Sequence, residues 1–165
     1  MMSSTLIRDF RQADAEEVNR LAVAAFEEFR SNYSDWDALR SIVGRMAELA
    51  DSGAIVVAEA RGDIVGAVAY IPPDRPKASY FEKAWPIIRS LVVHPAHRRA
   101  GIGRAMMERC IARARSDGAR VIALHTSPIM TVALPMYLRM GFELHHEAPP
   151  VFGVPYAVYV KRLLP

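Results

Sequence analysis

The chain contains a single cysteine, Cys110, so no intrachain disulfide can form. That scarcity excludes a secreted scaffold held by disulfides, and it equally excludes a zinc site built from several cysteines. No run of about 18 consecutive apolar residues occurs, so no membrane-spanning helix is expected. The first ten residues lack the continuous apolar core of a signal peptide, which makes a cytoplasmic location the expectation.

Net charge is also scarce, because 21 basic and 18 acidic residues leave a formal charge of only +3. The whole chain is therefore no polycation, and affinity for nucleic acid would have to come from local clustering. Hydrophobic residues make up 52% of the chain and charged residues 24%, as in ordinary globular proteins. No repeat or linker divides it, and 165 residues suffice for one core, so we predict a single domain spanning residues 1–165.

The N-terminal third predicts one strand followed by two helices. Residues 6–11 predict a short strand, and Asp14 with Glu17 three positions later has the pattern of a capping box. A first helix is predicted from the apolar residues that follow at helical spacing, namely Val18, Leu21, Ala22, Ala25 and Phe29. A second helix is predicted from Ser34 or Asp35, with an apolar stripe that runs to Ala50 and a stop at residues 51–53.

The remainder alternates β-branched runs with one long and one short helical segment. Two strands flank Arg61-Gly62-Asp63 as a hairpin, and a polar, proline-bearing loop covers residues 74–85. Further strands are predicted at 86–93, 120–125, 142–147 and 156–162, with helices at 103–116 and 136–139. The order β-α-α-β-β-β-α-β-α-β-β indicates an α/β fold with a mixed sheet and a right-handed crossover around the long helix.

The stretch HPAHRRAGIGRAM, residues 94–106, joins a buried strand to that long helix. A glycine-bearing turn at a helix start directs several backbone N–H groups at one point and favours an anion. A Walker phosphate loop is excluded because no Gly-Lys pair occurs, and a Rossmann fingerprint is excluded because Met106 stands where its third glycine belongs. Spacing alone leaves an anion site and a solvated basic helix entry about equally favoured.

Two motifs go further. The segment LVVHPAHRRAGIGRAMM contains Arg-x-x-Gly-x-Gly directly after a strand and resembles the acyl-CoA pyrophosphate loop of the GNAT superfamily of N-acetyltransferases. Downstream, ALPMYLRMGF resembles that family's Ala-x-x-x-Tyr-x-x-x-Gly-Phe segment, at the expected distance. The resemblance covers essentially the whole chain. It implies a GNAT-like, largely antiparallel sheet of six to seven strands, helices on both faces and a splayed central strand pair.

The same resemblance implies transfer of an acetyl group from acetyl-CoA to a primary amine of a small molecule or peptide, by direct attack in a ternary complex without a metal. The backbone amide of Val92 or Val93 would then polarise the thioester carbonyl. The resemblance assigns binding of acetyl-CoA to Leu91, Val92, Val93, Arg98, Arg99, Ala100, Gly101, Ile102, Gly103 and Arg104.

The catalytic residues are only partly specified. Tyr137 matches the family's tyrosine near the CoA sulfur, where a phenol can donate a proton to a departing thiolate, although core packing would also explain it. Many relatives carry a glutamate on the strand before the loop, but here that strand reads Ile-Ile-Arg-Ser at residues 87–90. His125, at the end of the next strand, is the leading candidate base; a structural, hydrogen-bonded histidine and a water chain remain alternatives. Glu27 and Glu28 are weaker candidates.

Other readings stay open at this level. A catalytically silent acyl-CoA-binding module would lack the base, and a nucleic-acid-binding domain would use the arginines around residues 97–115. Phe29, Tyr33, Trp36, Phe152 and Tyr156 suggest an aromatic wall for the acceptor, and the nearby carboxylates of Glu27, Glu28 and Asp35 would suit a cationic amine. Relatives often form homodimers, and the sequence leaves the oligomeric state undecided. The His145-His146 pair lacks a third metal ligand at recognisable spacing.

Overall fold

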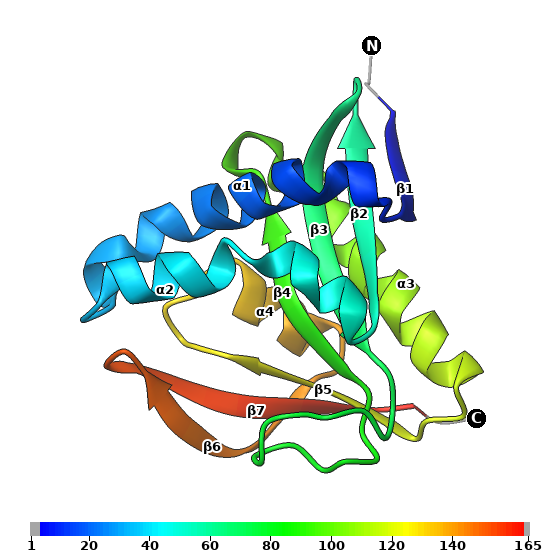
Figure 1. The fold of residues 1–165 in the computed structure, drawn as a ribbon. Coiled ribbons are helices and arrows are strands. Elements are labelled where there is room, and N and C mark those ends of the chain that lie inside the picture. Colours follow the sequence, from blue (N-terminus) through cyan, green and yellow to red (C-terminus); the bar gives the residue numbers. More distant parts are fainter. Residues whose placement is uncertain (1–3, 164–165) are drawn as a thin grey trace.

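One sheet with the strand order β1-β2-β3-β4-β5-β7-β6 organises residues 4–163, the part of the chain that this computed structural model describes (Figure 1). The strands are β1 Thr5–Asp9, β2 Ala54–Ala60, β3 Asp63–Ile71, β4 Ile87–Val93, β5 Val121–Thr126, β6 Glu143–Val151 and β7 Val154–Arg162. The α-helices are α1 Ala15–Phe26, α2 Trp36–Val43, α3 Ile102–Ser116 and α4 Ala133–Arg139. Every neighbouring pair of strands is antiparallel except β4 and β5. The predicted fold class and order of elements are confirmed.

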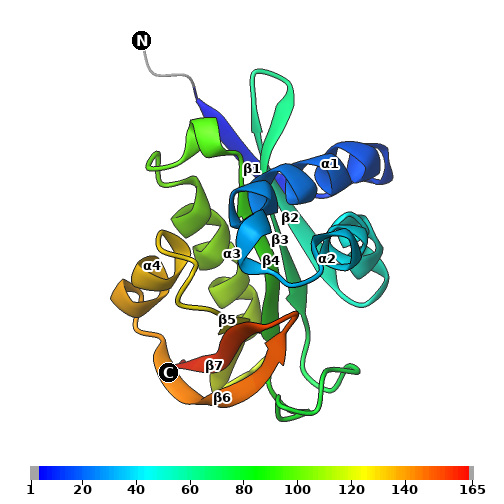
Figure 2. The same ribbon diagram turned by 90° about the vertical axis from the view of Figure 1, so that its left-hand side faces the viewer.

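The helices cover both faces of this sheet. Figure 2 shows α1 and α2 on one side and α3 and α4 on the other. The predicted apolar stripe of α1 packs on the sheet through Val18, Leu21, Ala22 and Ala25. On the opposite face, α3 contributes a layer in which Cys110 is 1% exposed. Burial raises the pKa of the Cys110 thiol to about 12, so this cysteine is an inert core residue, as the sequence predicts.

The parallel strands β4 and β5 separate almost as soon as they meet. Ile87 opposite Ala123 is the one residue pair recorded between them within residues 4–163. Farther along β4, Ser90 has a φ of +55°, and the β3 register slips there, so that Ala67 faces Val92 while Ala69 faces Arg89. A bulge of this kind bends its strand. The predicted splay is therefore present, and the later part of β4 has a backbone edge that β5 does not cover.

The predicted capping box at Asp14 and Glu17 is wrong. The Asp14 carboxylate accepts hydrogen bonds from the Arg8 guanidinium at 2.9 and 3.0 Å and from the Arg11 backbone N–H at 2.8 Å. The Glu17 carboxylate accepts one from the Ile64 N–H at 2.7 Å. The carboxylates that local spacing assigns to the helix start are therefore hydrogen-bonded to the Arg8 guanidinium of β1 and to the Ile64 N–H of β3 instead.

The second predicted helix is shorter than its apolar stripe. Asp35 caps it as expected, with its carboxylate accepting from the Ala38 N–H at 3.0 Å, but α2 ends at Val43 and a 3₁₀ helix follows over Met46–Asp51. A β-carbon on Gly44 would lie 3.3 Å from the Val23 side chain of α1. The close approach of the two helices therefore favours glycine at a position where glycine also weakens the helix.

Candidate active site

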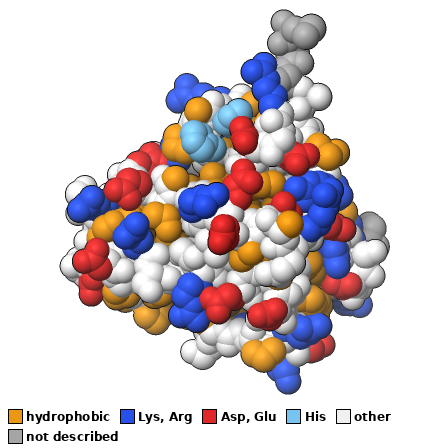
Figure 3. Space-filling model, turned by 45° about the horizontal axis from the view of Figure 1, so that its top comes forward, with side chains coloured by type: hydrophobic (Ala, Val, Ile, Leu, Met, Phe, Trp, Pro, Cys, Tyr) orange, Lys and Arg blue, Asp and Glu red, His pale blue; other side chains and the backbone are white. Residues whose placement is uncertain are grey.

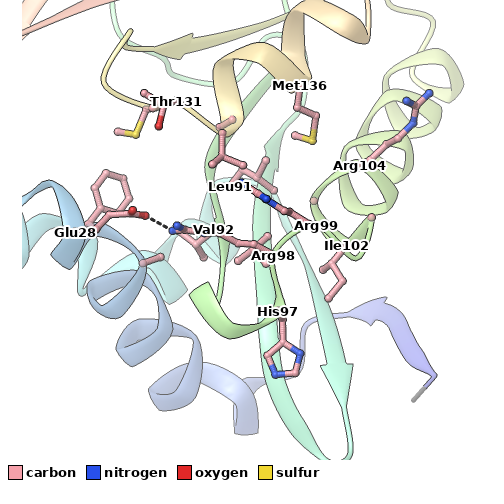
Figure 4. Close-up of a pocket in the computed structure, with 18 of the residues that line it drawn as sticks. Glu28, Leu91, Val92, His97, Arg98, Arg99, Ile102, Arg104, Thr131 and Met136 are labelled. Carbon is pink, nitrogen blue, oxygen red and sulfur yellow. Dashed lines mark hydrogen bonds and ion pairs between the residues drawn. The ribbon is translucent and has the colours of Figure 1, made fainter. Parts of the chain in front are cut away.

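A cavity of about 330 Å³ lies where β4 passes through its loop into α3 (Figure 4). The end of α1, β4, the loop, the start of α3 and the region of α4 all line it. The residues that the sequence assigned to the cofactor and that line this cavity are Leu91, Val92, Val93, Arg98, Arg99, Gly101, Ile102, Gly103 and Arg104. Ala100 is the exception, since it does not contribute to the lining.

The start of α3 is open to an anion. Gly101 caps the helix with a φ of +78°, which a glycine adopts without strain, and it offers no side chain to the first turn. The N–H groups of Ile102, Gly103 and Arg104 belong to that turn and have no acceptor within the helix. Arg99 also has a positive φ, +66°, a strained value for a residue with a side chain and typical of functional loops. The chain therefore presents converging N–H donors and basic side chains to one cavity.

An ion pair crosses the mouth of this cavity. The Arg98 guanidinium donates a hydrogen bond to the carboxylate of Glu28, which follows α1 (Figure 4). Sequence reasoning missed this pair because 70 residues separate its members. It also missed Thr131, Val132 and Met136, which close the cavity from the region of α4 and carry no recognisable signal. Arg104 makes a local pair with Glu108 at 3.0 Å on the exposed side of α3.

A second cavity, of about 340 Å³, lies on the other side of the splay. Four residues line both cavities, so the two spaces meet beside β4: Phe26, Leu91, Met130 and Ala133. The second cavity is lined by aromatic and aliphatic side chains together with Arg89, His125 and Tyr137. Both predicted catalytic residues therefore lie beyond the junction rather than at the loop.

His125 of β5 is held in an aromatic stack. Its ring lies 4.8 Å from Tyr80 and 4.4 Å from Tyr156, with near-parallel planes, and Phe81 meets it edge-on. Its Nε2 is buried and has no hydrogen-bond partner among the described residues. Burial, and then the charge of Arg89, lowers the pKa of His125 to about 4, so the imidazole is neutral at pH 7. His125 is thus not anchored by a hydrogen bond at Nε2 to any described residue.

Acid should destabilise the protein through His125. Its pKa in the folded state lies below the ordinary 6.5, so the unfolded chain binds more protons at acidic pH. Stability is therefore expected to fall by about 1–3 kcal/mol from this group as the pH drops from about 6.5 through about 4. Urea unfolding at pH 7 and pH 4.5 measures the loss, and His125→Phe, which keeps a ring in the stack, should lose correspondingly less. Equal losses in both proteins would contradict the assignment.

Tyr137 of α4 is largely buried and packs against Phe142, with ring centroids 6.0 Å apart. The same side chain reaches the second cavity, and no hydrogen bond from its hydroxyl to the described residues is present. Burial raises the pKa of Tyr137, so the phenol stays protonated and acts as a donor. Pro135 is tolerated because it is the third residue of α4, within the first turn, where its missing N–H costs nothing.

The three carboxylates that the sequence suggested for a cationic amine lie outside the second cavity and have other partners. Glu27 pairs with Arg30 at 3.4 Å, Glu28 pairs with Arg98, and Asp35 caps α2. No aspartate or glutamate of residues 4–163 lines the second cavity.

The aromatic wall is present in part. Tyr156 lines the second cavity, and its hydroxyl is 2.5 Å from that of Tyr33. Phe29 lines the first cavity instead. Trp36 and Phe152 pack around the buried cluster beside α2 and line neither cavity. The second cavity therefore has an aromatic side, built mainly from residues that the sequence did not single out, such as Tyr80 and Phe81.

The surface carries no extended patch of one sign on the face that Figure 3 shows, where basic and acidic side chains alternate. Within residues 4–163 there is no group of three or more side chains suited to a metal ion. In that same range, no helix has the length and apolar character needed to cross a membrane.

Comparison with known proteins agrees with this geometry. Residues 15–142 match the model of the Acetyltransferase (GNAT) family, which is more than half of the chain. The chain belongs to the GNAT family. The resemblance read from the two motifs is thereby confirmed.

Individual GNAT relatives match only part of their own length to this chain, whereas a solved structure matches nearly all of it. The chain is 38% identical over 87 residues to N-acetyltransferase family 8 member 3 of Rattus norvegicus, which covers 53% of this chain and 37% of the rat protein. It is 35% identical over 102 residues to streptothricin acetyltransferase of Streptomyces lavendulae, covering 60% and 49%. The match thus spans less than half of either relative. Among solved structures, a GNAT family acetyltransferase from Brucella melitensis in complex with acetyl-CoA has a TM-score of 0.68 and 25% identity, covering 99% and 91% of the two chains.

Proposed function

We propose that this GNAT protein transfers an acetyl group from acetyl-CoA to a primary amine, with both substrates bound together. The observation that carries the proposal is the junction of the two cavities at Leu91, with converging helix N–H groups on one side and His125 with Tyr137 on the other. An acetyl-CoA molecule with its phosphates at the loop would extend past Leu91, so its acetyl group would lie beside the second cavity.

The loop and the start of α3 would hold the donor's pyrophosphate. Arg98 and Arg99 supply positive charge there, and the N–H groups of the first turn supply directed donors. Gly103 allows close approach, because a β-carbon at that position would lie at the cavity wall beside Met136 and Val93. The uncovered edge of β4 would take the pantetheine arm by backbone hydrogen bonding, and a main-chain N–H of Val92 or Val93 would polarise the thioester carbonyl.

Two side chains would move protons. The amine nitrogen attacks the carbonyl carbon, the carbon–sulfur bond breaks, and one proton must leave the nitrogen while the sulfur gains one. His125 is neutral and lines the second cavity, and it would accept the amine's proton through water, because its unpartnered Nε2 is buried. Tyr137, which is protonated and lines the same cavity, would donate a proton to the sulfur. The β4 strand itself carries no carboxylate that could replace His125.

Two measurements test this function. Titration calorimetry should show acetyl-CoA binding at micromolar to low-millimolar concentration, and a thiol-release assay across amines, amino acids, polyamines, aminoglycosides and peptides should reveal at least one acceptor. Absence of acetyl-CoA binding at millimolar concentration would refute the proposal. Binding without transfer to any acceptor would instead indicate a silent acyl-CoA-binding module.

Removing the charge of Glu28 should strengthen donor binding. Its carboxylate neutralises Arg98 at the mouth of the first cavity, and both side chains are partly exposed, so the pair itself contributes no more than about 1 kcal/mol. In Glu28→Gln the guanidinium is free for a phosphate, and we expect the acetyl-CoA dissociation constant to fall about two- to fivefold at low salt. Calorimetry at two salt concentrations measures this, with Glu27→Gln as the neighbouring control. Weaker binding in Glu28→Gln alone would contradict the competition.

A further inference from the structure

The charges around the second cavity are all of one sign. Arg89 and Lys77 are its two basic lining residues, and no carboxylate of residues 4–163 joins them. Lys77 is already engaged, because its ammonium donates to the carbonyls of Pro72 at 2.9 Å and Arg75 at 3.0 Å, which ties the 72–86 loop together. The Arg89 side chain has no ion pair or hydrogen bond to any described residue, although its backbone pairs with Ala69 of β3. The cavity therefore presents one free guanidinium.

The rest of the lining is apolar and aromatic. Tyr80 and Phe81 come from the loop, Tyr156 from β7, and Ile71 and Ile87 from the sheet. Arg89 is close enough to this wall for its charge to lower the pKa of His125 and to oppose the burial-driven rise in the pKa of Tyr80. An acceptor with an additional positive group would be repelled here, whereas a carboxylate would find the planar two-pronged donor that suits it.

The position of Arg89 fits an amine and a carboxylate on the same small molecule. Arg89 precedes Leu91 by two residues on β4, which is at most roughly 7 Å because the Ser90 bulge lies between them, and Leu91 lies at the junction of the cavities. An arginine side chain can span most of that separation. A carboxylate held by Arg89 would thus leave an amine on the adjacent carbon near the junction, with His125 and Tyr137 beside it.

We propose that the acceptor is an amine that also carries a carboxylate, of the α-amino acid type with an apolar or aromatic side group, and that Arg89 is the residue that selects for the carboxylate. This inference rests on the proposed acetyltransferase function. The reaction balances as the protonated amino acid plus acetyl-CoA giving the N-acetyl amino acid, free CoA thiol and one proton. The apolar side group lies against Phe81 and the neighbouring aliphatic wall.

Matched acceptors test the selection. L-phenylalanine is compared with phenethylamine, and L-leucine with 3-methylbutylamine, in the thiol-release assay with mass detection of the product. The carboxylated member of at least one pair should show a kcat/KM at least about tenfold higher. In Arg89→Gln that ratio should fall at least about fivefold while the acetyl-CoA dissociation constant stays within twofold, and Arg89→Lys should keep part of it. Lys83→Gln, an exposed cation of the neighbouring loop that lines only a separate cavity, serves as the control.

A binding readout keeps the test independent of turnover. Calorimetry on the CoA-bound protein compares N-acetyl-L-phenylalanine with N-acetylphenethylamine, and only the former should lose affinity in Arg89→Gln. Equal binding of the two, or a ratio unchanged in Arg89→Gln, overturns this inference. If acetyl-CoA binds and uncharged amines are acetylated as well as the amino acids, this inference fails while the proposed function stands. If acetyl-CoA does not bind, the proposed function itself fails.

Discussion

Gly103→Ala is expected to stabilise the fold slightly and to weaken acetyl-CoA binding at least about 50-fold. The nearest atoms to an added β-carbon are the Met136 sulfur and a Val93 methyl, both at 3.6 Å, which is ordinary contact. Gly103 is the second residue of α3, and alanine favours helix over glycine, so the free energy of unfolding should rise by up to about 1 kcal/mol. The same methyl group would occupy the cavity wall where the pyrophosphate must approach the helix N–H groups. Losing one or two hydrogen bonds to a charged group costs about 1.5–3 kcal/mol each.

The opposite signs of the two effects make this variant informative. Urea unfolding and calorimetry with acetyl-CoA are measured on Gly103→Ala and on Ala112→Ser, a substitution on the exposed side of the same helix. The control should bind acetyl-CoA as the wild type does. Unchanged affinity in a well-folded Gly103→Ala protein would show that the phosphates lie elsewhere, and the assignment of the loop would then be wrong.

The donor side of the site is predictable from sequence because it is local. A strand, a glycine-bearing turn and a helix start are contiguous in residues 87–116, and their backbone geometry follows from residue types. Gly101 adopts the left-handed conformation that its identity permits, and nine of the ten residues assigned to the cofactor line one cavity. Only Ala100 does not line it. Local structure therefore brings most residues of the proposed donor site together before tertiary contacts are considered.

The proposed acceptor side could be predicted only in part, because it depends on contacts between distant segments. His125 is stacked between Tyr80 and Tyr156, one from an irregular loop and one from the last strand. The bulge at Ser90 needs a positive φ, which an isolated serine inside an apolar strand sequence does not indicate. The sequence suggested Glu28 for an acceptor site, but its carboxylate forms an ion pair with Arg98. Sequence spacing did not predict the partners of Asp14 and Glu28, because each carboxylate pairs with an arginine outside its own helix.

Replacing Tyr137 by phenylalanine should lower turnover between about 10- and 100-fold while the acetyl-CoA dissociation constant changes less than twofold. A general acid contributes about 10²–10⁴, and a thiolate with a pKa near 8.5 leaves fairly well unaided, so the expected loss lies at or below the lower end of that range. The phenol lies in the second cavity and not against the loop that would hold the donor, which is why binding should survive. Because the hydroxyl makes no hydrogen bond within the described chain, removing it should leave the free energy of unfolding nearly unchanged.

Tyr159→Phe provides the matched control, since Tyr159 packs against the same core cluster but lines neither cavity. Steady-state thiol release gives kcat for both variants, and calorimetry and urea unfolding give donor affinity and stability. A loss of turnover in Tyr137→Phe alone, at constant stability, assigns the phenol to proton donation at the sulfur. Unchanged turnover would remove that role and leave Tyr137 as a packing residue of α4. A loss of stability together with activity would also indicate a structural role, because a hydroxyl that stabilises the fold must be hydrogen-bonded in the folded protein.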